Sequence, residues 1–233
     1  LVDRVLELEK GVRIKAINVL EPLHREAGRF DRLVALVELR LETLEDASSR
    51  VAELIGLAEL HEAGRSDPKT AFATWLRVLT EDSTRLETLD ELERIAAAEG
   101  LYGELSSQLE KRLADVYDQD AERSILARVA CIKEERLHDD KGATAAYKRM
   151  LDGGDTSARV LSPLDRLYTR QHQWRELDEI LELEIQNTDG VEEQNLLKYR
   201  QGHIREHEFN DISSAIAIYR DIVEAAPDHR DAT

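Results

Sequence analysis

Apolar residues recur along most of the chain at steps of three and four positions, which is the spacing of one face of an α-helix. In the stretch 89–113, Leu92, Ile95, Leu105 and Leu109 follow this spacing. Short polar breaks such as YDQD and HDDKG separate the apolar runs. The pattern predicts thirteen helices and no strand, at residues 1–9, 14–27, 30–45, 48–63, 67–81, 84–99, 102–116, 119–136, 139–151, 157–171, 174–187, 191–208 and 211–225.

The pattern returns every 72 residues. Two of the repeating positions are aromatic in all three copies: Phe30, Tyr102 and Trp174 at one, and Trp75, Tyr147 and Tyr219 at the other. At an aromatic content of 5%, chance would produce such a triple about once in 8,000 positions. We therefore predict the end of a preceding repeat followed by three copies, at residues 1–16, 17–88, 89–160 and 161–232.

Each copy is predicted to hold four helices, arranged as two hairpins. A single helical hairpin cannot bury its apolar faces, whereas stacked neighbours bury a continuous core. The aromatic positions, including Trp75 and Trp174, are interpreted as part of this core.

The second hairpin of each copy resembles the tetratricopeptide repeat (TPR). Leu126, Val129 and Ala130 match that family's pattern on the first helix, and Ala143 with Tyr147 match the second helix one residue late. The two hairpins of a copy are offset by 34 residues, the usual length of that repeat. The resemblance implies an all-α fold, a right-handed α-solenoid of antiparallel helix hairpins (TPR-like superhelix), continuous over residues 1–233.

In the TPR family the first helix of each hairpin lines a concave groove that holds a peptide or a helix of a partner. The resemblance places mostly acidic residues there, and the candidates are Glu21, Glu59, Glu62, Glu93, Glu134, Asp165, Tyr199, His203 and Glu206. It implies a non-enzymatic scaffold whose acidic groove binds a basic or amphipathic protein segment. Three of these residues, Glu62, Glu134 and Glu206, share one repeat position and are expected to be exposed.

Two other functions stay open. The chain can be a structural spacer or assembly segment that stacks on neighbouring repeats of the same longer chain and uses no groove. The stretch HIREH at 203–207 also matches H-x-x-E-H, a zinc-site pattern of some hydrolases.

The repeat argues against a zinc hydrolase. Glu206 shares its repeat position with Glu62 and Glu134, and only the two histidines, His203 and His207, are peculiar to the third copy. A zinc site also needs a third protein ligand, and nothing in the sequence marks one. The histidines are therefore interpreted as groove-lining or solvated residues, and no cofactor or metal is expected.

Composition narrows the class of partner. With 32 basic and 49 acidic residues the net charge is −17, which disfavours nucleic acid because phosphate binding needs a basic surface. The lone Cys131 excludes an intramolecular disulfide.

No apolar run reaches the roughly 18 residues that insertion into a membrane requires. The chain begins with Leu1, which indicates a piece of a longer protein. The compartment stays open, with a soluble cytoplasmic protein slightly favoured.

Overall fold

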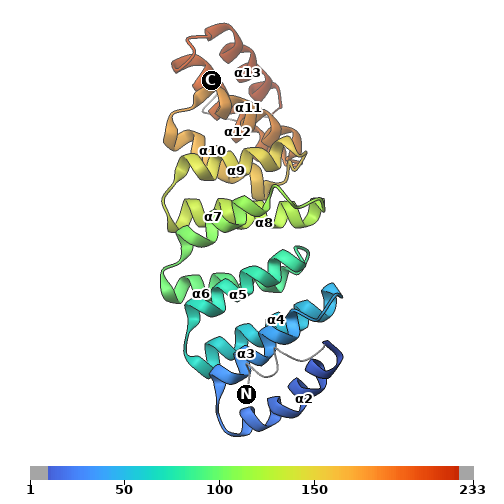
Figure 1. Cartoon of the computed structure of the whole chain (residues 1–233). Coiled ribbons are helices and arrows are strands. Elements are labelled where there is room, and N and C mark those ends of the chain that lie inside the picture. The colour runs from blue at the N-terminus through green and yellow to red at the C-terminus, as the bar shows by residue number, and fades with distance from the viewer. Residues whose placement is uncertain (1–9, 226–233) are drawn as a thin grey trace. The chain divides into compact units, whose positions relative to one another are not determined.

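The computed structural model describes residues 10–225, which form helices and turns (Figure 1). Within this range no strand occurs, and the bounds are α2 Lys10–Glu26, α3 Phe30–Leu41, α4 Ala47–Glu59, α5 Pro68–Glu81, α6 Leu86–Glu99, α7 Tyr102–Arg112, α8 Gln119–Cys131, α9 Asp140–Asp152, α10 Ala158–Gln171, α11 Trp174–Asn187, α12 Val191–His207 and α13 Ile212–Ala225. Two π-helical turns, η1 Leu60–Gly64 and η2 Ile132–Arg136, continue α4 and α8. The all-α class is confirmed for these residues, and the helix predicted at 1–9 lies outside them.

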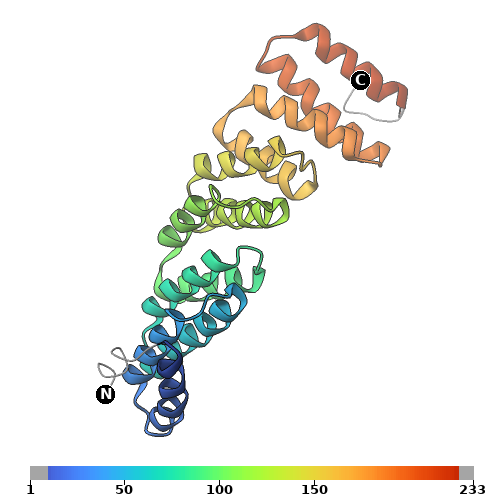
Figure 2. The ribbon, with the colours of Figure 1, turned by 45° about the vertical axis from the view of Figure 1, so that its right-hand side comes forward.

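The helices divide into two compact units, and the division lies within α8 between Ile125 and Leu126. In unit 1 each helix from α2 to α7 packs against the next, and in unit 2 the same holds from α9 to α13. Figure 2 shows α12 and α13, at the red end of the chain, lying side by side as a hairpin. The helical-hairpin repeat is therefore confirmed within each unit. A single continuous solenoid over the whole chain stays a prediction.

Buried side chains follow the repeat. The alanines at one position, Ala71, Ala143 and Ala215, are each at most 1% exposed. A side chain this small lets two helices approach closely, so larger neighbours can pack against both. Trp75 is also buried, as predicted. Trp174 is only half-buried, because it is the first residue of α11 and lies at the hairpin turn instead of between two helices. The core interpretation is wrong for Trp174.

The turns repeat as closely as the core does. Left-handed backbone recurs every 72 residues in the turn of the first hairpin, at Gly28, Gly100 and His172, and in that of the second hairpin, at Ser66, His138 and Asn210. In the second hairpins an aspartate follows at once. The side chains of Asp67, Asp139 and Asp211 each accept a hydrogen bond from the backbone N–H three residues on. These N-caps begin the second helix of the hairpin.

In the described part of the chain no helix is both long and apolar enough to cross a membrane.

Two glycines of unit 1 test how far the turn conformation stabilises the hairpin. Gly100 has φ of 70° and Gly56 lies within α4, and a Cβ added at either would meet nothing within 4 Å. We expect Gly100→Ala to lower the free energy of unfolding by about 1–2 kcal/mol, because an L-residue is strained in the left-handed region. Gly56→Ala should raise it by about 0.5–1 kcal/mol, because glycine weakens a helix interior.

The measurement is urea unfolding followed by the fluorescence of Trp75, in a Trp174→Phe background so that only unit 1 reports. A loss of stability in both alanine variants would show that crowding, and not backbone conformation, governs these positions.

Candidate partner-binding clefts

Each unit contains an open cleft, and the two clefts share three positions of the repeat while the rest of their linings differ in position. Cleft 1, of about 590 Å³, lies in unit 1 among α2, α3 and α4, and its lining includes Glu21, Arg40, Glu53 and Glu59. Cleft 2, of about 720 Å³, lies in unit 2 among α10, α11 and α12, and its lining includes Leu161, Asp165, Glu184 and Leu197. Both have the size of peptide- or ligand-binding depressions.

The positively charged side chain of Arg40 lines cleft 1. The Arg40 guanidinium donates to the Glu53 carboxylate at 2.9 Å and also to the Glu21 carboxylate. Burial disfavours the charged form of Arg40, but the hydrogen bonds to Glu53 and Glu21 outweigh it and raise its pKa. Glu59 lies exposed on the rim. Of the acidic groove candidates, Glu21 and Glu59 therefore line this cleft, and Glu21 is already neutralised.

Cleft 2 has the opposite arrangement. Glu184 occupies the repeat position of Arg40, Asp165 that of Glu21, and Leu197 that of Glu53. Arg200 donates two hydrogen bonds to Asp165, at 2.7 and 2.8 Å. The Glu184 Oε2 atom is buried and has no hydrogen-bond partner among residues 10–225.

The surroundings of Glu184 favour its protonated form. Burial raises the pKa of Glu184 most, and the negative charge of Asp165 and a side-chain hydrogen bond with Asp165 raise it further, to about 7, although Arg200 acts in the opposite direction. Sequence reasoning missed Glu184, because its importance depends on a side chain 19 positions away on the preceding helix. The one available signal was the change from Arg40 to Glu184 at a position that otherwise looks solvent-facing.

Two of the three glutamates predicted to be exposed at one repeat position, Glu62 and Glu134, instead form ion pairs with arginines. Arg94 donates to Glu62 at 2.7 and 2.6 Å in unit 1, and Arg166 donates to Glu134 at 2.9 and 3.0 Å in unit 2. The two pairs are equivalent, because both partners recur after 72 residues. Each pair joins the end of one hairpin's first helix to the first helix of the next hairpin.

Glu134 is the most buried of these carboxylates. Its side chain is 6% exposed, and it accepts a further hydrogen bond of 2.9 Å from Arg170. Burial alone would raise its pKa, but the hydrogen bonds from Arg166 and Arg170 outweigh burial and lower it. The expectation of an exposed residue is therefore wrong for Glu134. Glutamates that recur at one repeat position look exposed in the sequence unless the arginines that recur at the partner position are also recognised.

The remaining candidates lie elsewhere. Glu93 on α6 is half-buried. Tyr199, His203 and Glu206 lie along α12, where the Tyr199 ring is 5.9 Å from that of Tyr219, and the Tyr219 hydroxyl donates to Glu206 at 3.1 Å. The structure brings these three residues onto one helix but not into cleft 2.

The histidines of HIREH lie side by side on α12. The His203 and His207 ring centroids are 4.2 Å apart, and Glu206 is 3.8 Å from His207. In the range that the structure describes, no group of three or more histidine, cysteine, aspartate or glutamate side chains is placed to hold a metal ion.

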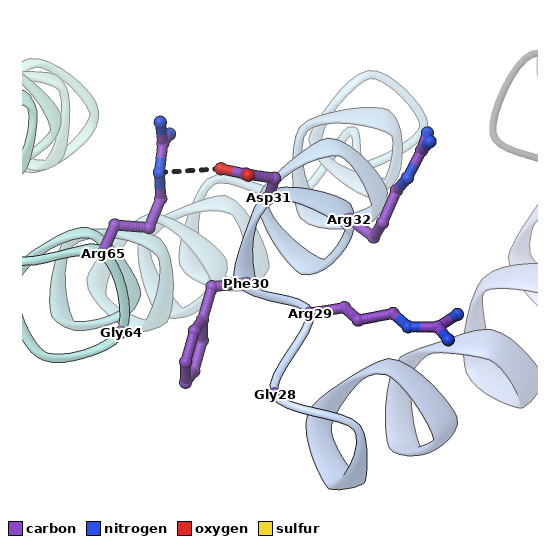
Figure 3. A pocket seen from close by; sticks show the side chains of 7 residues that line it. All are labelled: Gly28, Arg29, Phe30, Asp31, Arg32, Gly64 and Arg65. Carbon is purple, nitrogen blue, oxygen red and sulfur yellow. Dashed lines mark ion pairs between the residues drawn. The ribbon is translucent and has the colours of Figure 1, made fainter.

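A hollow at the turn between α2 and α3 has a basic rim but does not form an anion site. Figure 3 shows the Phe30 ring beside Gly64, while the side chains of Arg29, Arg32 and Arg65 point in different directions. Arg65 pairs with Asp31 at 3.1 Å. The equivalent hollow in unit 2 lies beside Trp174. These hollows follow from the aromatic at the start of the second helix.

No protein-family model matches the chain, and no curated protein matches its sequence. Several solved structures are similar to it, including the following three. YrrB, a TPR protein with an unusual peptide-binding site, is 14% identical with a TM-score of 0.42, over 77% of this chain and 88% of that chain. PilF of Pseudomonas aeruginosa is 15% identical with a TM-score of 0.43, over 94% of each chain. A thermophilic TPR protein of Thermus thermophilus is 15% identical with a TM-score of 0.34, over 78% of this chain and 94% of that chain.

The described residues form a repeat of antiparallel helical hairpins. This assignment depends on the 72-residue repeat and on the hairpin packing within each unit.

The two equivalent ion pairs should differ in their effect on stability. We expect Glu134→Gln to lower the free energy of unfolding of unit 2 by about 1–3 kcal/mol, because a buried charged acceptor of three hydrogen bonds is lost. Glu62→Gln should cost less than about 1 kcal/mol in unit 1, since its pair with Arg94 is solvated. Hydrogen exchange at pH 7, read separately for α9–α10 and for α5–α6, measures both. Equal losses would mean that burial does not distinguish the pairs.

Glu184 should make stability depend on pH. Because its pKa is about 7 in the folded chain and about 4.3 in an unfolded one, the folded chain binds more protons between these values. This contribution therefore destabilises the fold increasingly as pH rises from about 4.5 to about 7. Relative to the parent chain, Glu184→Gln should raise the melting temperature at pH 8 and leave it nearly unchanged at pH 5. A difference that does not vary with pH would contradict the assignment.

Proposed function

We propose that the chain is a non-enzymatic scaffold for protein–protein interaction, and that clefts 1 and 2 each accept a peptide or a helix of a partner. One observation carries the proposal: in each unit an open cleft lies among the same three helices of the repeat, and the side chains differ at the three repeat positions that the two clefts share. A repeat fold supplies the same depression several times, and substitutions within it set what each depression binds.

The charge of the chain supports a basic or amphipathic partner. A net charge of −17 attracts positively charged segments over long range. Glu59 is exposed on the rim of cleft 1, and of the three carboxyl groups in cleft 2, Asp155 and Asp165 each pair with an arginine whereas Glu184 does not. Such attraction raises the rate of association and weakens as salt screens it.

A structural spacer is the second candidate, and the ion pairs favour it. Glu62 with Arg94 and Glu134 with Arg166 join successive hairpins, so these carboxylates act within the chain. In a spacer these ion pairs would hold successive hairpins together, and the open clefts would bind nothing. Binding at the clefts therefore distinguishes the two functions.

The test is an array of 12-residue peptides of varied charge, probed with the full chain at low and high salt. We expect basic peptides to bind at 50 mM salt and to weaken at 500 mM. Two cleft-filling variants, Ala52→Trp in cleft 1 and Ser162→Trp in cleft 2, should each weaken a subset of these peptides at least about tenfold, because a buried contact surface is lost.

Glu87→Trp is the matched control, since Glu87 is exposed on α6 and lines neither cleft. It should leave the array pattern unchanged. A chain that binds no peptide is a spacer. If peptide affinity is the same in both filling variants as in the parent chain, the partner-binding surface lies outside the clefts.

A further inference from the structure

We infer that cleft 2 is a pocket for one lysine or arginine side chain of the partner, whose charged group pairs with Glu184. This inference rests on the proposed function, because the side chain belongs to the segment that the cleft accepts. Three independent observations support it: the internal comparison with cleft 1, the local balance of charges, and the lining of the cleft.

Cleft 1 shows what this position of the repeat holds when the cation belongs to the chain itself. There the Arg40 guanidinium lies between two carboxylates and bonds to both. In cleft 2 the same position is Glu184, and the position of Glu21 remains acidic as Asp165. The chain's own cation is thus replaced by a carboxyl group while its acidic neighbour is kept.

The charges around cleft 2 leave one carboxyl group without a cation. Asp165, on α10, is paired with Arg200 of α12, and Asp155, in the turn before α10, is paired with Arg159 at 2.8 Å. Among the residues that the structure describes, Glu184, on α11, has no ion pair, and its buried Oε2 atom has no donor. A buried acceptor without a donor is unfavourable, so a group that brings N–H donors and a positive charge is stabilised there.

The lining of the cleft suits a long basic side chain better than a bare ion. Leu161 on α10 and Leu197 on α12 give the cleft apolar walls beside the carboxyl groups. Lysine and arginine pack their methylene groups against such walls and place the charged head at the polar end. A small metal ion would leave these walls uncovered, and no group of three or more carboxylate, histidine or cysteine side chains in the described range is placed to hold one.

Binding should be coupled to the release of one proton. At pH values below about 7 Glu184 is mostly protonated, and it must lose its proton to buffer when the ammonium or guanidinium group binds. The apparent affinity falls with the fraction of the ionised form. Asp165 and Arg200 face the same carboxyl group and stay paired throughout.

The experiment uses the full chain with labelled leucine methyl groups and observes Leu161 and Leu197 by NMR. The probes are Nα-acetyl-lysine amide, Nα-acetyl-arginine amide and, as the uncharged match, Nα-acetyl-norleucine amide. We expect the two basic probes to shift both leucines saturably, with an affinity at least about tenfold weaker at pH 5 than at pH 8. The norleucine probe should bind much more weakly.

Two substitutions test the role of Glu184. Glu184→Arg copies the residue that cleft 1 has at this position, so the chain supplies its own cation and the basic probes should no longer bind. Glu184→Gln keeps the shape, and it should weaken binding and remove its pH dependence. If circular dichroism shows that the Glu184→Arg variant is unfolded, the Glu184→Gln variant alone tests whether Glu184 binds the basic probes. Glu87→Gln in unit 1 is the control, because Glu87 is exposed and lines neither cleft, and it should change nothing at Leu161 or Leu197.

The inference is wrong if the basic probes do not shift the two leucines, if norleucine binds as tightly, or if Glu184→Gln binds like the parent chain. Displacement of the probes by millimolar Mg²⁺ or Ca²⁺ would also overturn it in favour of a metal site. These outcomes differ from failure of the proposed function, which a peptide array without any binding would show.

Discussion

The close approach of the two helices in each hairpin is the constraint on which the rest of the structure depends. In the hairpin of α12 and α13, a Cβ added at Gly202 would lie 2.6 Å from the ring of Tyr219. The equivalent residues, Ala58 and Ala130, are fully buried. Small residues on the first helix thus allow an aromatic on the second to lie across it, and the hairpin becomes rigid enough to present the same surfaces in each copy.

This constraint explains why the fold could be predicted and the clefts could not. Helix positions follow from the apolar spacing, and hairpins follow from columns of small and aromatic residues, all of which one sequence with internal repeats displays. The environment of a polar side chain depends instead on residues that are distant in sequence. Glu134 is buried because Arg166 and Arg170 reach it from α10, and Trp174 is half-exposed because it begins its helix. Neither fact is visible in a periodic pattern.

The repeat also separates what is fixed from what varies. Backbone turns, alanine columns and the Glu62–Arg94 type of ion pair recur, so they are parts of the architecture. Arg40 and Glu184 occupy one position and carry opposite charges. Since the surrounding helices are held by the recurring features, a change of charge at this position alters the chemistry of a cleft without disturbing the hairpin. This position forms ion pairs in cleft 1 and none in cleft 2, so it is where the chemistry differs between the copies.

Net charge is consequently a poor guide to where an acidic repeat protein binds. Four of the seven acidic residues predicted to attract a partner are neutralised within the chain: Glu21 by Arg40, Glu62 by Arg94, Glu134 by Arg166 and Asp165 by Arg200. A paired carboxylate in a rigid ion pair offers little to an incoming cation, because its hydrogen bonds would first have to break. The carboxyl group that matters is the one whose donors are missing. Glu184 satisfies this criterion in unit 2, where it lies in a cleft, beside a second carboxylate, with an acceptor atom that nothing in the described part of the chain satisfies.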